Sequence, residues 1–166
     1  MIRGGGQERG ARAGTENVAA IAGFGAAAEA TGRALAAEVP RMTALRDQLE
    51  AGIKAIASDA VIFGAQSPRL PQTTLFSVPG MKAETAVIAF DLEGVAVSSG
   101  SACSSGKVAP SHVLAAMAVE PGLAKGAIRV SLGYSTGPEE VESFQKAWAK
   151  LAESLYKARK HKDIAA

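Results

Sequence analysis

Glycine and proline divide the middle of the chain into runs that are too short for helices and rich in β-branched and aromatic residues. Such runs favour strands, and four are present: 61–63, 73–78, 95–97 and 127–132. Longer segments with apolar residues at helical spacing flank them, chiefly 17–57, which Pro40 breaks or kinks, and 141–155. Short strands alternating with helices predict a two-layer α/β or α+β sandwich.

The composition limits the partners that the chain can have. Its 166 residues carry a formal net charge of +2, which is too small to indicate nucleic acid or an anionic membrane surface. No apolar run approaches the roughly 20 residues that span a bilayer, and a single cysteine cannot form an internal disulfide. We therefore expect a soluble, cytoplasmic protein without nucleic acid or membrane partners. The basic residues within 157–162 are interpreted as a solvated helix end rather than a docking patch.

The single cysteine, Cys103, lies in a segment with almost no apolar surface. Within 98–106, every residue other than Ala102 and Cys103 is serine or glycine, which predicts an exposed, mobile loop. A lone cysteine is more often a small buried hydrophobe, but this loop cannot bury a thiol well. Cys103 is therefore a candidate nucleophile, and Lys107 and His112 are near enough in the sequence to favour its thiolate.

Arg129 interrupts an apolar strand pattern. Ile128, Val130 and Leu132 alternate with Arg129 and Ser131, so the two sets are expected on opposite faces of a sheet. A guanidinium that projects from a strand can bind a carboxylate with two parallel hydrogen bonds. The alternative, a solvated or ion-paired strand arginine, is equally compatible with this element alone.

The chain opens on a glycine-rich polar segment, 4–10, followed by a helix start at 14–17 with Thr15 as the expected N-cap. Flexible glycines, Arg9, Arg12 and a helix N-terminus together are typical of a site for an anion such as phosphate. The segment lacks the lysine of a P-loop and the preceding strand of a dinucleotide motif. A flexible crossing between domains is the alternative, and this opening suggests a piece of a larger protein.

Three segments in this order resemble the C-terminal portion of a group I cysteine desulfurase of the class V aminotransferase family: 4–10 with 14–17, then 98–106, then 128–133. The resemblance implies the C-terminal small domain of a fold type I pyridoxal-phosphate enzyme, with a small, mostly antiparallel sheet that has helices on one face. It also implies a glycine-rich segment from the large domain and dimer interface, a long kinked linking helix, and the small domain, at 1–16, 17–57 and 58–166.

The family converts L-cysteine to L-alanine and an enzyme-bound persulfide, with pyridoxal 5'-phosphate as the electron sink. The resemblance implies that Cys103 takes the sulfur, that Arg129 binds the substrate carboxylate, and that Thr15 reaches the cofactor phosphate of the partner subunit in a homodimer. It further implies a sulfur acceptor such as an iron-sulfur scaffold protein. Cys103 is thereby a candidate shared iron-sulfur ligand, and no other metal site is expected.

The resemblance does not extend to the residues that react with the cofactor. The family's Schiff-base lysine is expected upstream of Met1, and Lys82, Lys107 and Lys125 do not lie in the family's lysine motif. We therefore expect the isolated chain to lack desulfurase activity. Two alternatives stay open: a stand-alone carrier that accepts a persulfide on Cys103, and a non-catalytic interaction domain that pairs with an intact desulfurase.

Overall fold

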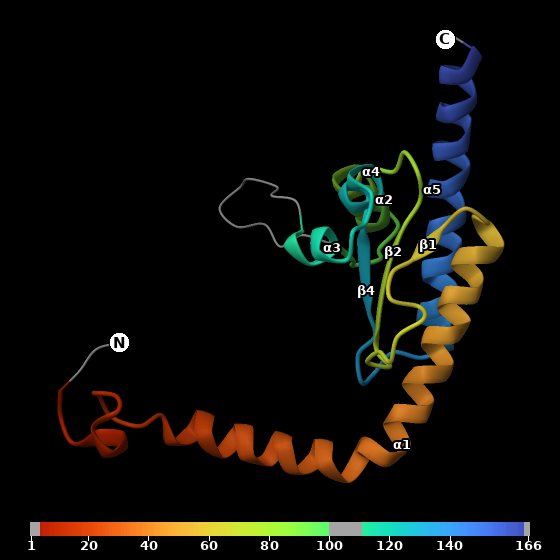
Figure 1. Ribbon diagram of the computed structural model, residues 1–166. Coiled ribbons are helices and arrows are strands. Elements are labelled where there is room, and N and C mark those ends of the chain that lie inside the picture. Colours follow the sequence, from red (N-terminus) through yellow and green to blue (C-terminus); the bar gives the residue numbers. More distant parts are fainter. Residues whose placement is uncertain (1–3, 100–110, 165–166) are drawn as a thin grey trace. The chain divides into compact units, whose positions relative to one another are not determined.

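The structure is a computed structural model that describes residues 4–99 and 111–164, with side chains to residue 160 (Figure 1). The chain divides into two compact units, Met1–Glu38 and Val39–Ala166. The second unit contains the sheet and the buried apolar side chains. Among the described residues, no helix combines the length and the apolar character needed to cross a bilayer.

The first unit begins with η1, a short 3-10 helix at Gln7–Gly10, and continues into α1, Val18–Ile56. The prediction that Thr15 caps this helix is wrong. The side-chain oxygen of Asn17 accepts a hydrogen bond from the amide of Ala20 at 3.1 Å instead. Asparagine satisfies a free amide of the first turn as well as serine or aspartate does, so the cap lies two residues further along than expected.

Pro40 lies inside α1, and the helix continues beyond it. Proline cannot donate a backbone hydrogen bond, and its ring crowds the preceding turn. On the C-terminal side of Pro40, four apolar side chains at helical spacing are buried, namely Met42, Leu45, Leu49 and Ile53. This periodicity is the one predicted from the sequence, and it fixes the side of α1 that faces the core.

The second unit is built on a four-stranded sheet with the strand order β1-β2-β4-β3. All neighbouring strands are antiparallel, which confirms the small antiparallel sheet. The strands are β1 Val61–Ile62, β2 Thr73–Ser77, β3 Ser98–Ser99 and β4 Ile128–Ser131. The predicted strand at 95–97 is misplaced by a few residues, because the described residues that pair with β4 on this side are Ser98 and Ser99.

Four further helices belong to the second unit: α2 Ala83–Leu92, α3 His112–Ala116, α4 Pro121–Lys125 and α5 Pro138–Ile164. The predicted cap of α3 is confirmed, because the Ser111 hydroxyl accepts a hydrogen bond from the Leu114 amide at 3.3 Å. The sequence gives no clear sign of α4. This helix depends on the Glu120 carboxylate, which accepts hydrogen bonds from two amides of the first turn, and on Pro121 at its first position.

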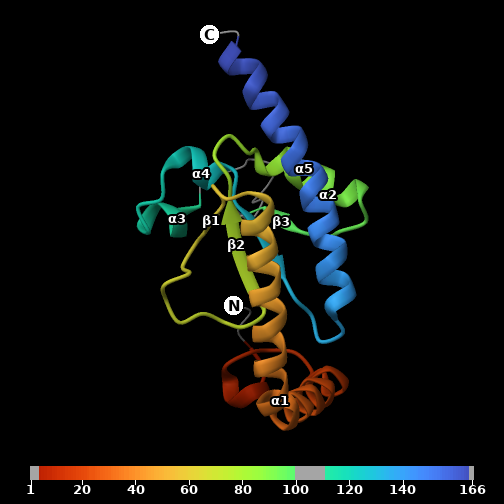
Figure 2. The same ribbon diagram turned by 90° about the vertical axis from the view of Figure 1, so that its right-hand side faces the viewer.

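One face of the sheet packs against residues 39–56 of α1 and against α5 (Figure 2). Phe76 of β2 meets Trp148 of α5 edge to face, with ring centroids 5.2 Å apart. Phe90 of α2 stacks on Phe144 of α5 at 5.0 Å. Such pairs add to the stabilisation that comes from apolar burial, so the aromatic cluster joins α2 and α5 to the same face of the sheet.

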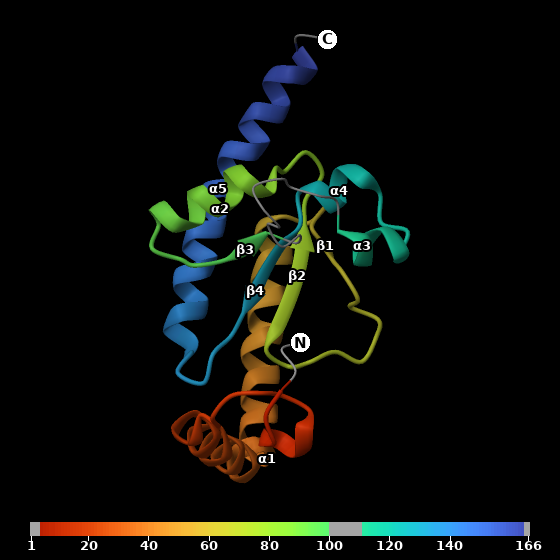
Figure 3. The same ribbon diagram turned by 90° about the vertical axis from the view of Figure 1, so that its left-hand side faces the viewer.

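The opposite face carries a smaller apolar cluster at the end where β4 begins. Phe63, Leu114 and Ala127 form its buried centre, and Leu75 of β2 packs against it. The short helices α3 and α4 lie at this end of the sheet (Figure 3). They therefore supply a small second layer, whereas α1 and α5 cover the main core face.

A partly buried network centred on Glu50 of α1 includes an ion pair with Arg69, in the connection before β2, and a hydrogen bond from Thr74 of β2. The Arg69 guanidinium donates two hydrogen bonds to the Glu50 carboxylate, at 2.7 and 3.0 Å, and the Thr74 hydroxyl donates a third at 2.7 Å. Burial by itself raises the pKa of Glu50, but these hydrogen bonds and the charges of Arg69 and Arg46 outweigh it and hold the pKa below its ordinary value of 4.5. The network fixes β2 against α1.

Removing the Glu50 charge should destabilise the second unit. Glu50→Gln leaves the Arg69 guanidinium without its carboxylate, and we expect a loss of about 2 kcal/mol in the free energy of unfolding at neutral pH. A carboxylate with a lowered pKa in the folded state stabilises fully above its unfolded pKa and loses that effect as the pH falls through its folded pKa. The difference between the proteins should therefore shrink below about pH 4.5.

Urea titrations followed by circular dichroism between pH 3 and pH 7 measure this difference. Glu153→Gln is the matched control, because Glu153 forms an exposed pair with Lys157 on α5 and exposed pairs contribute little. Equal effects of the two substitutions, or a Glu50→Gln effect that does not depend on pH, would contradict the role of the network.

Candidate functional site

Arg129 lies in β4, an inner strand of the sheet, between β2 and β3. Its register partners are Leu75 on β2 and Ser98 on β3. Its side chain is exposed, whereas Ile128 and Val130 on either side of it are buried. The predicted alternation is therefore confirmed, and the guanidinium projects from the face that α1 and α5 do not cover.

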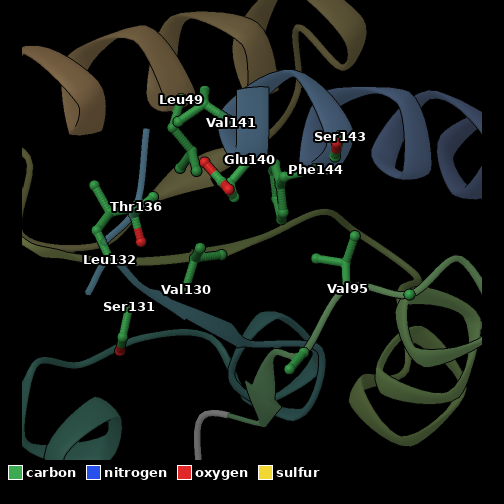
Figure 4. Close-up of a pocket in the computed structure, with 12 residues that line it drawn as sticks. Leu49, Val95, Val130, Ser131, Leu132, Thr136, Glu140, Val141, Ser143 and Phe144 are labelled. Atoms are coloured by element: carbon green, nitrogen blue, oxygen red, sulfur yellow. The ribbon is translucent and has the colours of Figure 1, made fainter. Parts of the chain in front are cut away.

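A close view of β4 shows the same alternation. Val130 points toward Leu49 of α1 and Phe144 of α5, whereas Ser131 points the opposite way (Figure 4). Because side chains two residues apart on a strand share a face, Ser131 and Arg129 lie on the same side of the sheet. β4 thus carries an apolar face for the core and a polar face that is available to a ligand.

Within the described part of the chain, no carboxylate pairs with Arg129. The planar guanidinium offers five N–H donors in a fixed fork that matches the geometry of a carboxylate. An exposed arginine on an inner strand is held by backbone pairing on both sides of its residue. This arrangement is suited to a carboxylate that approaches from solvent.

Cys103 and Lys107 lie outside the described residues, but both ends of the segment that contains them are defined. The segment begins after Ser99, whose register partner Ile128 is next to Arg129. It ends at Ser111, the cap of α3, a helix whose Leu114 is buried beside Ala127, the residue before β4. The cysteine-containing segment therefore starts beside β4 and ends at a helix that is anchored through Leu114 next to the start of β4.

His112, the other residue expected to favour a thiolate, is the first residue of α3 and is exposed. It lies directly after the cap residue, in a helix whose Leu114 belongs to the apolar cluster on the side of the sheet where Arg129 projects. The structure thus keeps His112 near the end of the cysteine segment. Its effect on the thiol stays a prediction.

Thr15 belongs to the first unit and is exposed. It lines a surface hollow of about 480 Å³ together with Arg12, Asn17 and apolar residues of α1 such as Phe24. Arg12 already pairs with Glu8 at 3.1 Å and donates hydrogen bonds to nearby carbonyls. The hydroxyl of Thr15 is therefore better suited than Arg12 to meet an incoming anion.

A second hollow, of about 310 Å³, lies between β4, α5 and the segment before β3 (Figure 4). Its walls include Leu49, Val95 and Phe144. Two of its polar side chains already form hydrogen bonds within the protein. Glu140 accepts one from the Gly137 amide, and Thr136 accepts one from the Gly133 amide. Arg129 does not line this hollow, which is accordingly not the carboxylate site.

Residues 5–144 match the family described as Aminotransferase class-V. The chain belongs to this family. It is 44% identical over 142 residues to the cysteine desulfurase NifS of Azotobacter vinelandii, covering 86% of the chain and 35% of that protein. It is 42% identical over 155 residues to the cysteine desulfurase IscS of Dictyoglomus turgidum, covering 93% and 39%.

Solved structures agree with these relatives. The X-ray structure of a NifS-like protein from Rickettsia africae has a TM-score of 0.83 at 37% identity and covers 92% of this chain and 39% of that one. A second NifS-like protein has a TM-score of 0.81 at 34% identity, with 93% and 39% covered. These matches confirm the family and the fold. The chain spans only 35–39% of the length of the relatives named here.

Leu75 and Ser98 are neighbours of Arg129 that the sequence analysis did not single out. Their proximity depends on the pairing of β4 with β2 and β3, which no local pattern encodes. A signal for Leu75 exists, since Thr74 and Phe76 are buried on one face and Leu75 alternates with them. That alternation places Leu75 on the face of Arg129 once the register is known.

If Arg129 binds a ligand and does not stabilise the fold, replacing its side chain should change the free energy of unfolding only slightly. We expect Arg129→Gln to change the free energy of unfolding by less than about 1 kcal/mol, since cross-strand contacts of one exposed side chain are worth no more. Val130→Ala, the adjacent buried position, should cost about 2 kcal/mol. Urea unfolding compares them, and equal losses would show that Arg129 is a structural residue.

Proposed function

We propose that this chain is part of a pyridoxal-phosphate-dependent cysteine desulfurase, in which it carries the sulfur-accepting cysteine and the arginine that binds the substrate carboxylate. One observation carries the proposal: the exposed Arg129 of an inner strand lies beside the point where the Cys103 segment leaves the sheet. Relatives named as cysteine desulfurases, at 42–44% identity, support it.

Arg129 would orient L-cysteine by its carboxylate. A guanidinium fork makes two parallel hydrogen bonds to a carboxylate, which fixes the plane of that group as well as its distance. The amino acid then has few remaining orientations, and its sulfur can be presented to one side. Orientation of this kind lowers the entropic part of the barrier to a reaction between two groups.

Cys103 would accept the sulfur. Its thiolate forms a bond to the substrate sulfur while the carbon–sulfur bond breaks, and the electron pair stays with the carbon skeleton, which takes up a proton to become L-alanine. Pyridoxal phosphate, when bound, supplies the electron sink for this cleavage. The product on the chain is a Cys103 persulfide, and a serine- and glycine-rich segment can carry it to an acceptor.

One residue of this chain is suited to contact the cofactor, at its phosphate group. Thr15 presents an exposed hydroxyl beside Asn17 near the start of α1, and the dipole of a helix favours an anion at its N-terminus. We propose that Thr15 contacts the cofactor phosphate of the partner subunit in a homodimer. The described lysines Lys82 and Lys125 are not assigned as Schiff-base residues, so the reacting lysine would come from another part of the enzyme.

The wider setting is proposed on the same basis. We propose a cytoplasmic enzyme that passes its persulfide to an acceptor such as an iron-sulfur scaffold protein, with Cys103 as a candidate shared cluster ligand. The described residues contain no group of three or more metal-binding side chains of the His, Cys, Asp and Glu type. The proposed parts are the glycine-rich segment 1–16, the linking helix 17–57 and the small domain 58–166.

The test is desulfuration by the chain together with a separately supplied cofactor-binding part of a related desulfurase, with L-cysteine and pyridoxal phosphate. We expect L-alanine and a one-sulfur adduct on Cys103, measured by mass spectrometry, only when both parts are present. Cys103→Ser is the control and should abolish the adduct, because a hydroxyl cannot hold a persulfide.

The outcomes separate the alternatives. An adduct that forms from a persulfide donor but never from L-cysteine would favour a carrier. The absence of both L-alanine and the adduct under all conditions would contradict the proposed function.

A further inference from the structure

We propose that Leu75 is a positioning residue that holds the Arg129 guanidinium in one orientation on the exposed face of the sheet. The inference rests on the proposed function of Arg129 as a carboxylate ligand. It concerns a residue of β2 that lies far from Arg129 in the sequence and meets it only through the strand register.

The hydrogen-bond pattern between β2 and β4 identifies the kind of pair that Leu75 and Arg129 form. The amide of Leu132 donates to the carbonyl of Gln72 at 2.8 Å, so these two facing residues are a hydrogen-bonded pair. Facing pairs of antiparallel strands alternate between hydrogen-bonded and non-hydrogen-bonded. Counting along the register from this pair, Leu75 and Arg129 form a non-hydrogen-bonded pair.

The backbone of Leu75 forms its hydrogen bond toward β1, on the side away from β4. Its carbonyl accepts a hydrogen bond from the amide of Phe63 at 2.9 Å, which directs its polar groups toward β1 and away from β4. This agrees with the pair type assigned to Leu75 and Arg129. In such pairs the α-carbons are only about 4.5 Å apart and the side chains lie closest.

The other cross-strand neighbour of Arg129, Ser98, restricts the Arg129 side chain little. Ser98 pairs with Arg129 from β3, and the alternation on that side makes it a hydrogen-bonded pair, with α-carbons about 5.5 Å apart. Its side chain is short and exposed. Of the two described residues that face Arg129 on the neighbouring strands, Leu75 is therefore both the closer one and the apolar one.

Leu75 is itself held in place. It is half-buried and packs against the cluster centred on Phe63, Leu114 and Ala127. A long cationic side chain lays its methylenes along an apolar surface and keeps its charged end in water. A fixed Leu75 thus restricts the stem of Arg129 and directs the guanidinium outward.

The expected consequence is tighter substrate binding rather than faster chemistry. A free arginine side chain loses much rotamer freedom when its guanidinium is fixed by a ligand. A neighbour that restricts it beforehand reduces that loss. Removing the Leu75 side chain should therefore raise KM for L-cysteine and leave kcat nearly unchanged.

The direct experiment uses the chain itself and measures motion of the Arg129 side chain by the 15N heteronuclear NOE of its Nε–Hε group, identified by its loss in Arg129→Lys. We expect Leu75→Ala to lower this NOE clearly and Leu75→Met to retain it, since methionine keeps the volume. Thr73→Ala, which alters the next pair on the same face, is the matched control and should leave the NOE unchanged.

Backbone amide chemical shifts of β4 show whether each variant keeps the strand register. If Leu75→Ala unfolds, the NOE of folded Leu75→Met becomes the deciding measurement. An unchanged NOE in folded Leu75→Ala, or a lowered NOE in Leu75→Met with β4 intact, would overturn the positioning role.

The second measurement uses the chain combined with the cofactor-binding part of a relative. We expect Leu75→Ala to raise KM for L-cysteine about tenfold, with kcat within about twofold, and Leu75→Met to restore KM. A fall in kcat with KM unchanged would contradict the inference. Absence of L-alanine with the unaltered chain would instead contradict the proposed function, and the NOE result would still decide the role of Leu75.

Discussion

The burial of Ile128 and Val130 beneath α1 and α5 is the constraint on which the position of Arg129 depends. Both side chains belong to the main apolar core, and residues of a strand alternate between its faces. A slip of β4 by one residue would bring Arg129 into that core and expose both apolar side chains. Burying an unpaired guanidinium costs several kcal/mol, so the core permits one register and leaves Arg129 outside.

The same constraint extends to β2. Phe76 is buried against Trp148, and the hydroxyl of Thr74 is bonded to the Glu50 carboxylate of α1. Both interactions act on the core side of β2 and hold Leu75 on the other side. Packing on one face of the sheet therefore determines which side chains meet on the opposite face, where the ligand is proposed to bind.

Much of this architecture was predicted from local patterns, because these features depend only on residues that are close together in the sequence. The alternation around Arg129, the helical spacing from Met42 to Ile53 and the Ser111 cap are of this kind, and all three are confirmed. The Thr15 cap failed because Asn17 competes for the same helix start. The nearness of Leu75 to Arg129 depends on pairing between distant strands, which a single sequence does not reveal.

The central claim is that Arg129 and Cys103 act on the same molecule of L-cysteine. The most direct test compares two routes to the Cys103 persulfide in the chain combined with a cofactor-binding part: from L-cysteine, and from inorganic polysulfide, which has no carboxylate. The account predicts that Arg129→Lys slows loading from L-cysteine at least about tenfold, because lysine lacks the bidentate fork, and leaves loading from polysulfide unchanged. Equal slowing of both routes, or of neither, would contradict it.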